Sequence, residues 1–180
     1  QWPDARPLRL LFRVAAADKE QPLRFRALRG CIRLADFAGD PTAVYLKTLS
    51  MTDRGEDIKL ILEGLGKTGT LEALETALRF RKQKAFQAEA SRAAVRIAGR
   101  YSWQDKERAI AVLNKIKKET DDGGLVNEIN RIFQELDRFK GHIRAWKGAG
   151  PYTLENVRDG KRVFNTAFAP EKDPASKDIV

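Results

Sequence analysis

The nonapeptide IRLADFAGD at residues 32–40 ends one predicted helix and begins the next, and it decides the fold because its pattern returns. Related phrases follow as LEGLGKTGT at 62–70 and as VRIAGRYSW at 95–103. Each phrase has an aliphatic residue, then a small residue and Gly within a few positions, and then a polar helix start. The phrases superpose on Leu34, Leu65 and Ile97, which are 31 and 32 residues apart. A stride of this length, with one helix pair per unit, is typical of stacked helical repeats.

Helical periodicity extends in both directions from these phrases and covers the first 140 residues. Apolar residues recur at steps of three and four, the spacing that places them on one face of a helix. The pattern predicts eight helices that pair in order along the chain. Polar residues that favour N-cap positions predict four of the helix starts, namely Asp40, Asp53, Thr70 and Ser102. The eighth helix carries a wide apolar stripe, with Leu125, Val126, Ile129, Ile132, Phe133, Leu136 and Phe139.

A single helix pair has too little apolar surface to offset the entropy lost on ordering its backbone, about 1–2 kcal/mol per residue. Stacked neighbours bury both sides of each pair, so the stripe on the last helix needs a cover. The stretch AWKGAGPY at 145–152 marks a change to Gly-, Pro- and aromatic-rich sequence. We therefore expect a helical domain at 1–140. A C-terminal extension at 141–180, irregular or β in character, is expected to pack on the last repeat and to begin a further domain.

Two segments carry a resemblance to a known family. LRFRALRGCIRLA at 23–35 and EASRAAVRIAGRY at 89–101 have small residues where helices touch, and scattered Arg. In these features the chain resembles the HEAT-like branch of the armadillo-type repeats over about 1–140. The resemblance implies an all-α, right-handed α-solenoid of about four helix pairs. The repeats are shorter than usual, and the usual Asp–Arg pairing between helices is not traced consistently.

The C-terminal segment carries a second resemblance. Its W…GPY and F…FAPE stretches are similar to the entry into a β-sandwich-like module. Such modules follow helical repeats in multi-domain exported bacterial proteins, often with carbohydrate-related partners, so the resemblance implies an exported or periplasmic fragment of a longer protein. Trp146 and Tyr152 in this segment are candidates for stacking on a sugar or peptide, or for anchoring the segment on the repeats.

The remaining composition narrows the possible chemistry. The only cysteine, Cys31, excludes an internal disulfide and is expected to be a small buried hydrophobe. With His142 as the only histidine, a zinc site and a serine–histidine triad are both disfavoured, and no metal or cofactor is expected. No apolar run approaches the length of about 20 residues that spans a bilayer. The N-terminus lacks the pattern of a signal peptide.

The net charge of +9 is concentrated in one place. Residues 79–100 hold 7 Lys and Arg against 1 Glu, which accounts for 6 of the 9 excess charges. A cationic strip could follow a phosphate backbone or contact an acidic partner, or it could be a solvated helix face. The candidate binding residues are Arg79, Arg81, Lys82, Lys84, Arg92, Arg96 and Arg100.

Three functions are compatible with this sequence. The first is a non-catalytic interaction scaffold or spacer that presents a curved surface and its local basic patch to a protein or glycan. The second is nucleic-acid backbone binding, although the middle repeat has Leu60 and Gly64 where the flanking repeats have Arg. The third is a HEAT-like DNA glycosylase that uses Trp103 and Asp105, although Trp103 is also explained as a residue that staples the helix entry or fills a repeat junction.

Overall fold

The computed structural model describes residues 4–17 and 20–138, which belong to the compact unit Gln1–Lys140. Across these residues the chain is helical and has no strand, which confirms the all-α prediction for this part of the protein. The extension expected at 141–180 lies outside the described residues. The helices are α1 (Leu8–Ala17), α2 (Gln21–Leu34), η1 (Ala35–Phe37), α3 (Pro41–Leu49), α4 (Gly55–Leu65), α5 (Leu71–Phe80), η2 (Lys84–Phe86), α6 (Gln87–Tyr101), α7 (Lys106–Glu119) and α8 (Gly123–Arg138), where η marks a short 3-10 helix.

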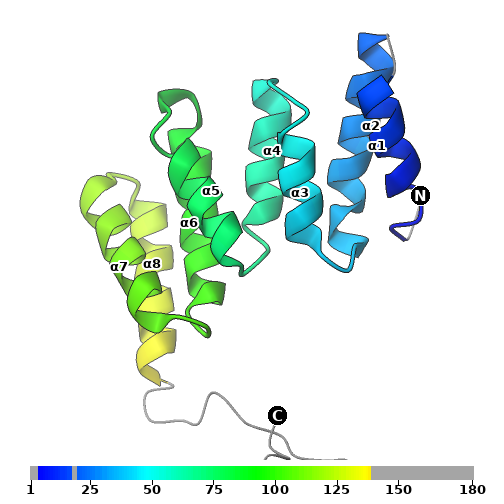
Figure 1. Cartoon of the computed structure of the whole chain (residues 1–180). Helices are drawn as coiled ribbons and strands as arrows, with labels where there is room; N and C mark the ends of the chain where they lie inside the picture. The colour runs from blue at the N-terminus through cyan, green and yellow to red at the C-terminus, as the bar shows by residue number, and fades with distance from the viewer. Residues whose placement is uncertain (1–3, 18–19, 139–180) are drawn as a thin grey trace, which may run out of the picture. The chain divides into compact units, whose positions relative to one another are not determined.

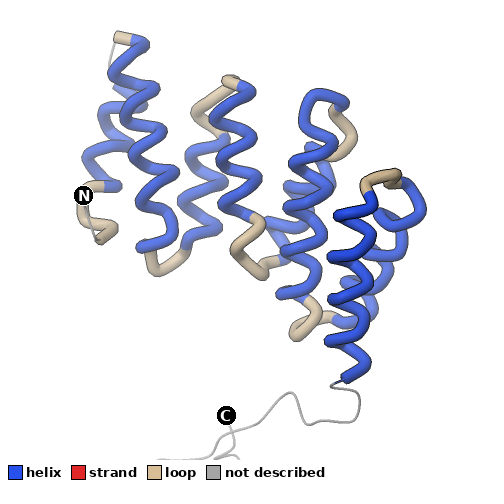
Figure 2. Tube along the Cα trace, turned by 180° about the vertical axis from the view of Figure 1, so that it is seen from behind, coloured by secondary structure: helices blue, strands red, loops and turns tan. Residues whose placement is uncertain are grey.

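The eight α-helices form four antiparallel pairs that follow one another in a row, from α1–α2 to α7–α8 (Figure 1). The same row is seen from behind in Figure 2. Each helix packs on its partner, and α2, α4, α6 and α8 also contact one another in succession. We call these four helices the even-helix layer. All closely contacting α-helices are one or two positions apart in the chain, so each pair is supported by its immediate neighbours.

The apolar core is divided into two clusters of unequal size. The larger cluster begins at Ala35 and continues through all the later helices to Leu136. The three aliphatic residues that superpose between repeats, Leu34, Leu65 and Ile97, are all buried, one on each of three successive even-numbered helices. The smaller cluster lies between α1 and α2 and consists of Ala15, Ala27 and Leu28, with Leu11, Val14 and Met51 packed against it.

Two of the four predicted helix starts are confirmed. The Asp40 carboxylate accepts a hydrogen bond from the backbone N–H of Ala43, and Thr70 Oγ1 accepts one from Ala73. Both side chains satisfy a backbone donor that has no partner inside the helix.

The other two predicted starts are wrong. Helix α4 begins at Gly55, and the residue before it, Arg54, forms no side-chain cap. Acidic residues in the first turn of α4, and not Asp53, favour the start of this helix. Ser102 ends α6, where its hydroxyl donates to the carbonyl of Gly99 at 2.6 Å. Helix α7 is capped three residues later by Asp105, which accepts from the backbone N–H of Arg108 at 3.0 Å.

Small residues allow two helices to approach closely within the second pair. A Cβ atom placed on Gly64 in α4 would overlap the ring of Tyr45 in α3. No side chain can occupy that space unless the ring moves, because the core is close-packed. The absence of a side chain at Gly64 therefore sets the separation of α3 and α4.

The apolar stripe of α8 packs toward α6 and α7. Leu125, Ile129, Ile132 and Leu136 are buried, and Phe133 is half-buried with Lys117 of α7 over its ring. The extension that was expected to cover this helix lies outside the described residues.

Candidate interaction surface

Ion pairs connect each helix of the even-helix layer to the next one. Arg29 on α2 pairs with Glu56 and Asp57 on α4, at 2.8 and 3.2 Å. At the next junction Lys59 on α4 pairs with Glu89 on α6 at 2.7 Å. Both junctions have the cation on the earlier helix and the acid on the later one.

The junction between α6 and α8 repeats this order. Arg92 pairs with Asp122 just before α8, and Arg96 pairs with Glu128 on α8, both at 3.5 Å. The partners in all these junctions are 27 to 32 residues apart, which is about one repeat. We call this series the ion-pair ladder. It shows pairing between successive helices that was not traced in the sequence.

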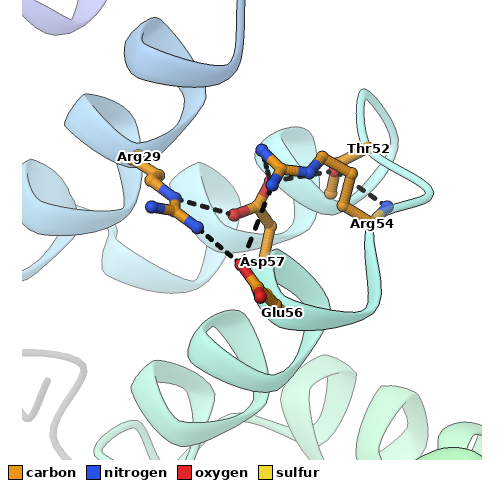
Figure 3. A network of polar contacts seen from close by, with 5 residues as sticks. All are labelled: Arg29, Thr52, Arg54, Glu56 and Asp57. Carbon is orange, nitrogen blue, oxygen red and sulfur yellow. Dashed lines mark hydrogen bonds and ion pairs between the residues drawn. The ribbon is translucent and has the colours of Figure 1, made fainter.

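The first junction of the ladder contains a buried charge (Figure 3). The carboxylate of Asp57 has no exposed surface, and Arg29 Nε donates to it from α2 at 3.2 Å. Thr52 Oγ1 donates to its other oxygen at 3.4 Å, and Arg54 Nη1 lies 3.8 Å away. Arg54 also covers the ring of Phe25 in α2, with its guanidinium carbon 4.2 Å from the ring centroid. Because an unpaired buried charge is costly, Asp57 holds these groups together.

Three of the seven candidate basic residues have structural partners. Arg81 has a side chain only 11% exposed, because Nε donates to Ser91 Oγ at 3.0 Å and Nη1 pairs with Glu119 at 2.7 Å. Arg92 and Arg96 belong to the ion-pair ladder. The local excess of positive charge in the sequence is therefore partly neutralised by acids of the following repeat.

The other four candidates are exposed. Arg79 lies over the neighbouring ring of Phe80, with 5.6 Å between the guanidinium carbon and the centroid. Lys82 and Lys84 lie between α5 and α6, and Arg100 lies in the last turn of α6. No acid among the described residues pairs with Lys82, Lys84 or Arg100.

The even-helix layer is hollowed in two adjoining places that share four lining residues, Ile32, Arg33, Leu60 and Glu63. The first hollow, which we call the apolar groove, has a volume of about 920 Å³ and lies between α1, α2, η1 and α4. Three large apolar side chains are exposed in it: Leu10 at 59%, Phe37 at 53% and Leu60 at 43%. The second hollow, of about 720 Å³, extends from α2 to α6 and is lined by members of the ion-pair ladder.

A polar cluster forms part of the lining of the apolar groove. The buried Tyr45 hydroxyl donates to Asp36 at 2.7 Å, and Lys67 Nζ donates to the other carboxylate oxygen at 2.8 Å. Partial burial would raise the pKa of Asp36, but the hydrogen bonds from Lys67 and Tyr45 hold it below its ordinary value. Burial and the neighbouring carboxylate raise the pKa of Tyr45. The cluster therefore carries a carboxylate held by two donors, and its tyrosine is neutral at ordinary pH.

The residues of the glycosylase hypothesis have other roles or settings. Trp103 is 57% exposed, so the interpretation that it fills a packed repeat junction is wrong. The Asp105 carboxylate caps α7. Neither residue lines the two hollows of the even-helix layer. Trp146 and Tyr152, the candidate aromatic binding residues, lie outside the described residues.

Three further properties of the described residues bear on thiol chemistry, metal binding and membrane insertion. Cys31 is buried, and that burial raises the pKa of its thiol to about 11, which confirms its interpretation as a buried apolar residue. Within residues 4–17 and 20–138, no three His, Cys, Asp or Glu side chains are grouped so as to hold a metal ion. None of the described helices combines the length and apolar character needed to cross a membrane.

Sequence reasoning missed Lys59, which pairs with the acid of the following repeat although the superposed position in its repeat is Leu60. The signal was available in the sequence as a cation followed by an acid one repeat later. Strictly equivalent positions do not show it, because Lys59 lies one residue before the superposed Leu60.

Comparison of the chain with protein-family models, with curated proteins and with solved structures finds no match.

Proposed function

We propose that residues 4–138 form a HEAT-like α-solenoid of four helix pairs that acts as a non-catalytic interaction scaffold for a protein partner. Two features support this proposal. Each helix pair packs on its immediate neighbours, as in repeat proteins whose stability is a sum over adjacent units. The ion pairs of the even-helix layer recur with a separation close to the repeat length.

One observation carries the functional part of the proposal. Leu10, Phe37 and Leu60 come from three different elements, and all three are exposed in one groove. Scattered exposed apolar residues are ordinary, whereas a hollow that gathers several of them is typical of a site that binds another molecule. Aliphatic and aromatic side chains in such a groove suit the apolar residues of a protein segment.

Nucleic-acid binding is the alternative, and the ion-pair ladder weighs against it. A protein that neutralises phosphates needs cations that are available to the ligand. Arg81, Arg92 and Arg96 already face acids of the chain at 2.7 to 3.5 Å. A ligand would have to replace these pairs or depend on the remaining exposed cations.

Selection from a random peptide library displayed on phage, with the whole chain as bait, tests the proposed function. A scaffold of this kind should select peptides that share a consensus motif and compete with one another for one surface. Charge reversal on the even-helix layer, as in Arg33→Glu at a residue that lines both hollows, should change the consensus. The matched reversal of Lys115, an exposed residue on α7, should leave it unchanged.

The nucleic-acid alternative is measured in parallel by fluorescence anisotropy with oligonucleotides of random sequence. Binding that is tight at about 50 mM salt and falls steeply by about 200 mM salt would establish the alternative. Peptides without any consensus, or a consensus unaffected by every change on the even-helix layer, would contradict the scaffold proposal.

A further inference from the structure

Among the described residues, the ion-pair ladder has a position at which the pair is not formed. Arg33 on α2 and Glu63 on α4 have the same order as the other pairs and a separation of 30 residues, within the range of the ladder. Both side chains are exposed, and no described residue forms an ion pair with either. The charges of Arg33 and Glu63 are therefore available to a ligand.

This open position lies in the apolar groove. Arg33 and Glu63 line it together with the exposed side chains of Leu10, Phe37 and Leu60. The other two charged groups of the groove, Asp36 and Lys67, are paired with each other at 2.8 Å. The groove thus offers a ligand three apolar contacts, one unpaired cation and one unpaired anion.

We propose that the apolar groove binds an amphipathic helix of a partner protein, which places apolar side chains on Leu10, Phe37 and Leu60. One acidic and one basic side chain of that helix pair with Arg33 and Glu63. The inference rests on the proposed scaffold function and names the site and the partner. A helix suits this site because residues at i, i+3, i+4 and i+7 share one face, so one face delivers both the apolar anchors and an acid–base pair.

Opposite charges at the two positions favour this occupant over a uniformly charged one. A polyacidic segment would place a carboxylate beside Glu63, and a polybasic segment would place a cation beside Arg33. Like charges brought together in an interface lower affinity and exclude the wrong partner. The groove is therefore selective for a mixed pair.

The apolar contacts are tested with a synthetic amphipathic helix that carries leucines on one face and a Glu–Lys pair four residues apart beside them. Binding to the whole chain is measured by fluorescence anisotropy. Leu60→Asp is expected to weaken binding by about tenfold or more, because a charge replaces a central apolar contact. Leu23→Asp is the matched control, since Leu23 is also on the even-helix layer, is 40% exposed and does not line the groove. Leu10→Ser provides a second groove variant at the most exposed of the three positions.

The charged contacts are tested with three versions of the peptide that carry Glu and Lys, two Lys, or two Glu. The wild-type chain should bind the mixed peptide best. Arg33→Glu should shift the preference to the two-Lys peptide, and Glu63→Lys should shift it to the two-Glu peptide, each by about tenfold. This outcome is independent of the direction in which the helix lies. Arg26→Glu, on an exposed α2 residue away from the groove, should leave the order unchanged.

The inference is overturned if the mixed peptide fails to bind, or if Leu60→Asp and Leu23→Asp have equal effects. An unchanged order of the three peptides with Arg33→Glu and Glu63→Lys also overturns it. These results leave the scaffold function standing if library peptides still show a consensus that depends on another part of the even-helix layer. The loss of both the consensus and the groove binding rejects the two proposals together.

Discussion

The first helix pair and the third are joined to the rest of the repeats in different ways. Helix α6 contacts α4, α5, α7 and α8 and buries eight of its residues, among them Ile97 and Val95. Helix α2 shares a small cluster with α1, and Arg29 extends from it to a buried carboxylate at the start of α4. An apolar junction is stabilised by the area of many contacts, whereas a polar junction depends on a few groups. The two junctions should therefore respond differently to single substitutions.

The largest effect is expected at the apolar junction. Ile97→Ala should lower the free energy of unfolding by about 4 kcal/mol, because it opens a cavity in the fully buried centre of α6. Urea denaturation followed by circular dichroism measures this loss. Leu23→Ala, at a half-exposed position, should change stability by less than about 1 kcal/mol. Similar small losses for both variants would show that α6 is not the centre of the core.

The polar junction is tested by Asp57→Asn, which keeps the shape of the side chain and removes its charge. Stability should fall by about 3 kcal/mol, since Arg29 and Arg54 lose the buried anion that they face. Hydrogen exchange should show lost protection in α1 and α2 before α5 to α8. Asp53→Asn, on an exposed residue of the same loop, is the control. Equal loss of protection in all helices would contradict a junction held by this group.

Acid should weaken the ion pairs that connect the repeats, with a smaller effect than either substitution. Hydrogen bonds from Lys59 and from the backbone lower the pKa of Glu89 below its ordinary 4.5, and backbone N–H groups and Arg92 lower that of Asp122 below 3.8. As the pH falls, the unfolded chain takes up these protons at a higher pH than the folded chain does. The stability that the two carboxylates contribute is therefore fully present above their ordinary pKa values and is lost as the pH falls through the lowered pKa values. Urea denaturation between about pH 7 and pH 3 measures the loss. Lys59→Gln should reduce the pH dependence, and an unchanged curve would contradict the role of the pair.

The smallest effect is expected at an exposed member of the ladder. Arg96→Gln should cost less than about 1 kcal/mol, because the pair with Glu128 at 3.5 Å is partly solvated. A double-mutant cycle with Glu128→Gln isolates the energy of the pair. A coupling energy as large as the effect of Asp57→Asn would mean that the two junctions are stabilised alike.

Much of the helical framework could be predicted, and the reasons are local. Apolar spacing of three and four residues identified the helices, and the caps at Asp40 and Thr70 were correct because a cap bonds to a backbone group three residues away. Ser102 was predicted to cap the start of α7, but a hydroxyl can also donate to a carbonyl in the last turn of a helix. In the structure it donates to the carbonyl of Gly99 at the end of α6. The candidate site was predicted less well, since counts of charge do not show which cations face acids.

Helix positions and their pairing along the chain follow from the order of the residues, because the forces that set them act within a few residues of each position. Whether a charged side chain forms an ion pair depends on its distance from groups on helices that are a whole repeat away. Arg81 and Arg96 both belong to the basic segment at 79–100. Arg81 is nearly buried against Ser91 and Glu119, whereas Arg96 is an exposed member of the ion-pair ladder. Only packing brings Leu10, Phe37 and Leu60 into one groove, since they come from three separate elements whose approach is set by the whole helical array.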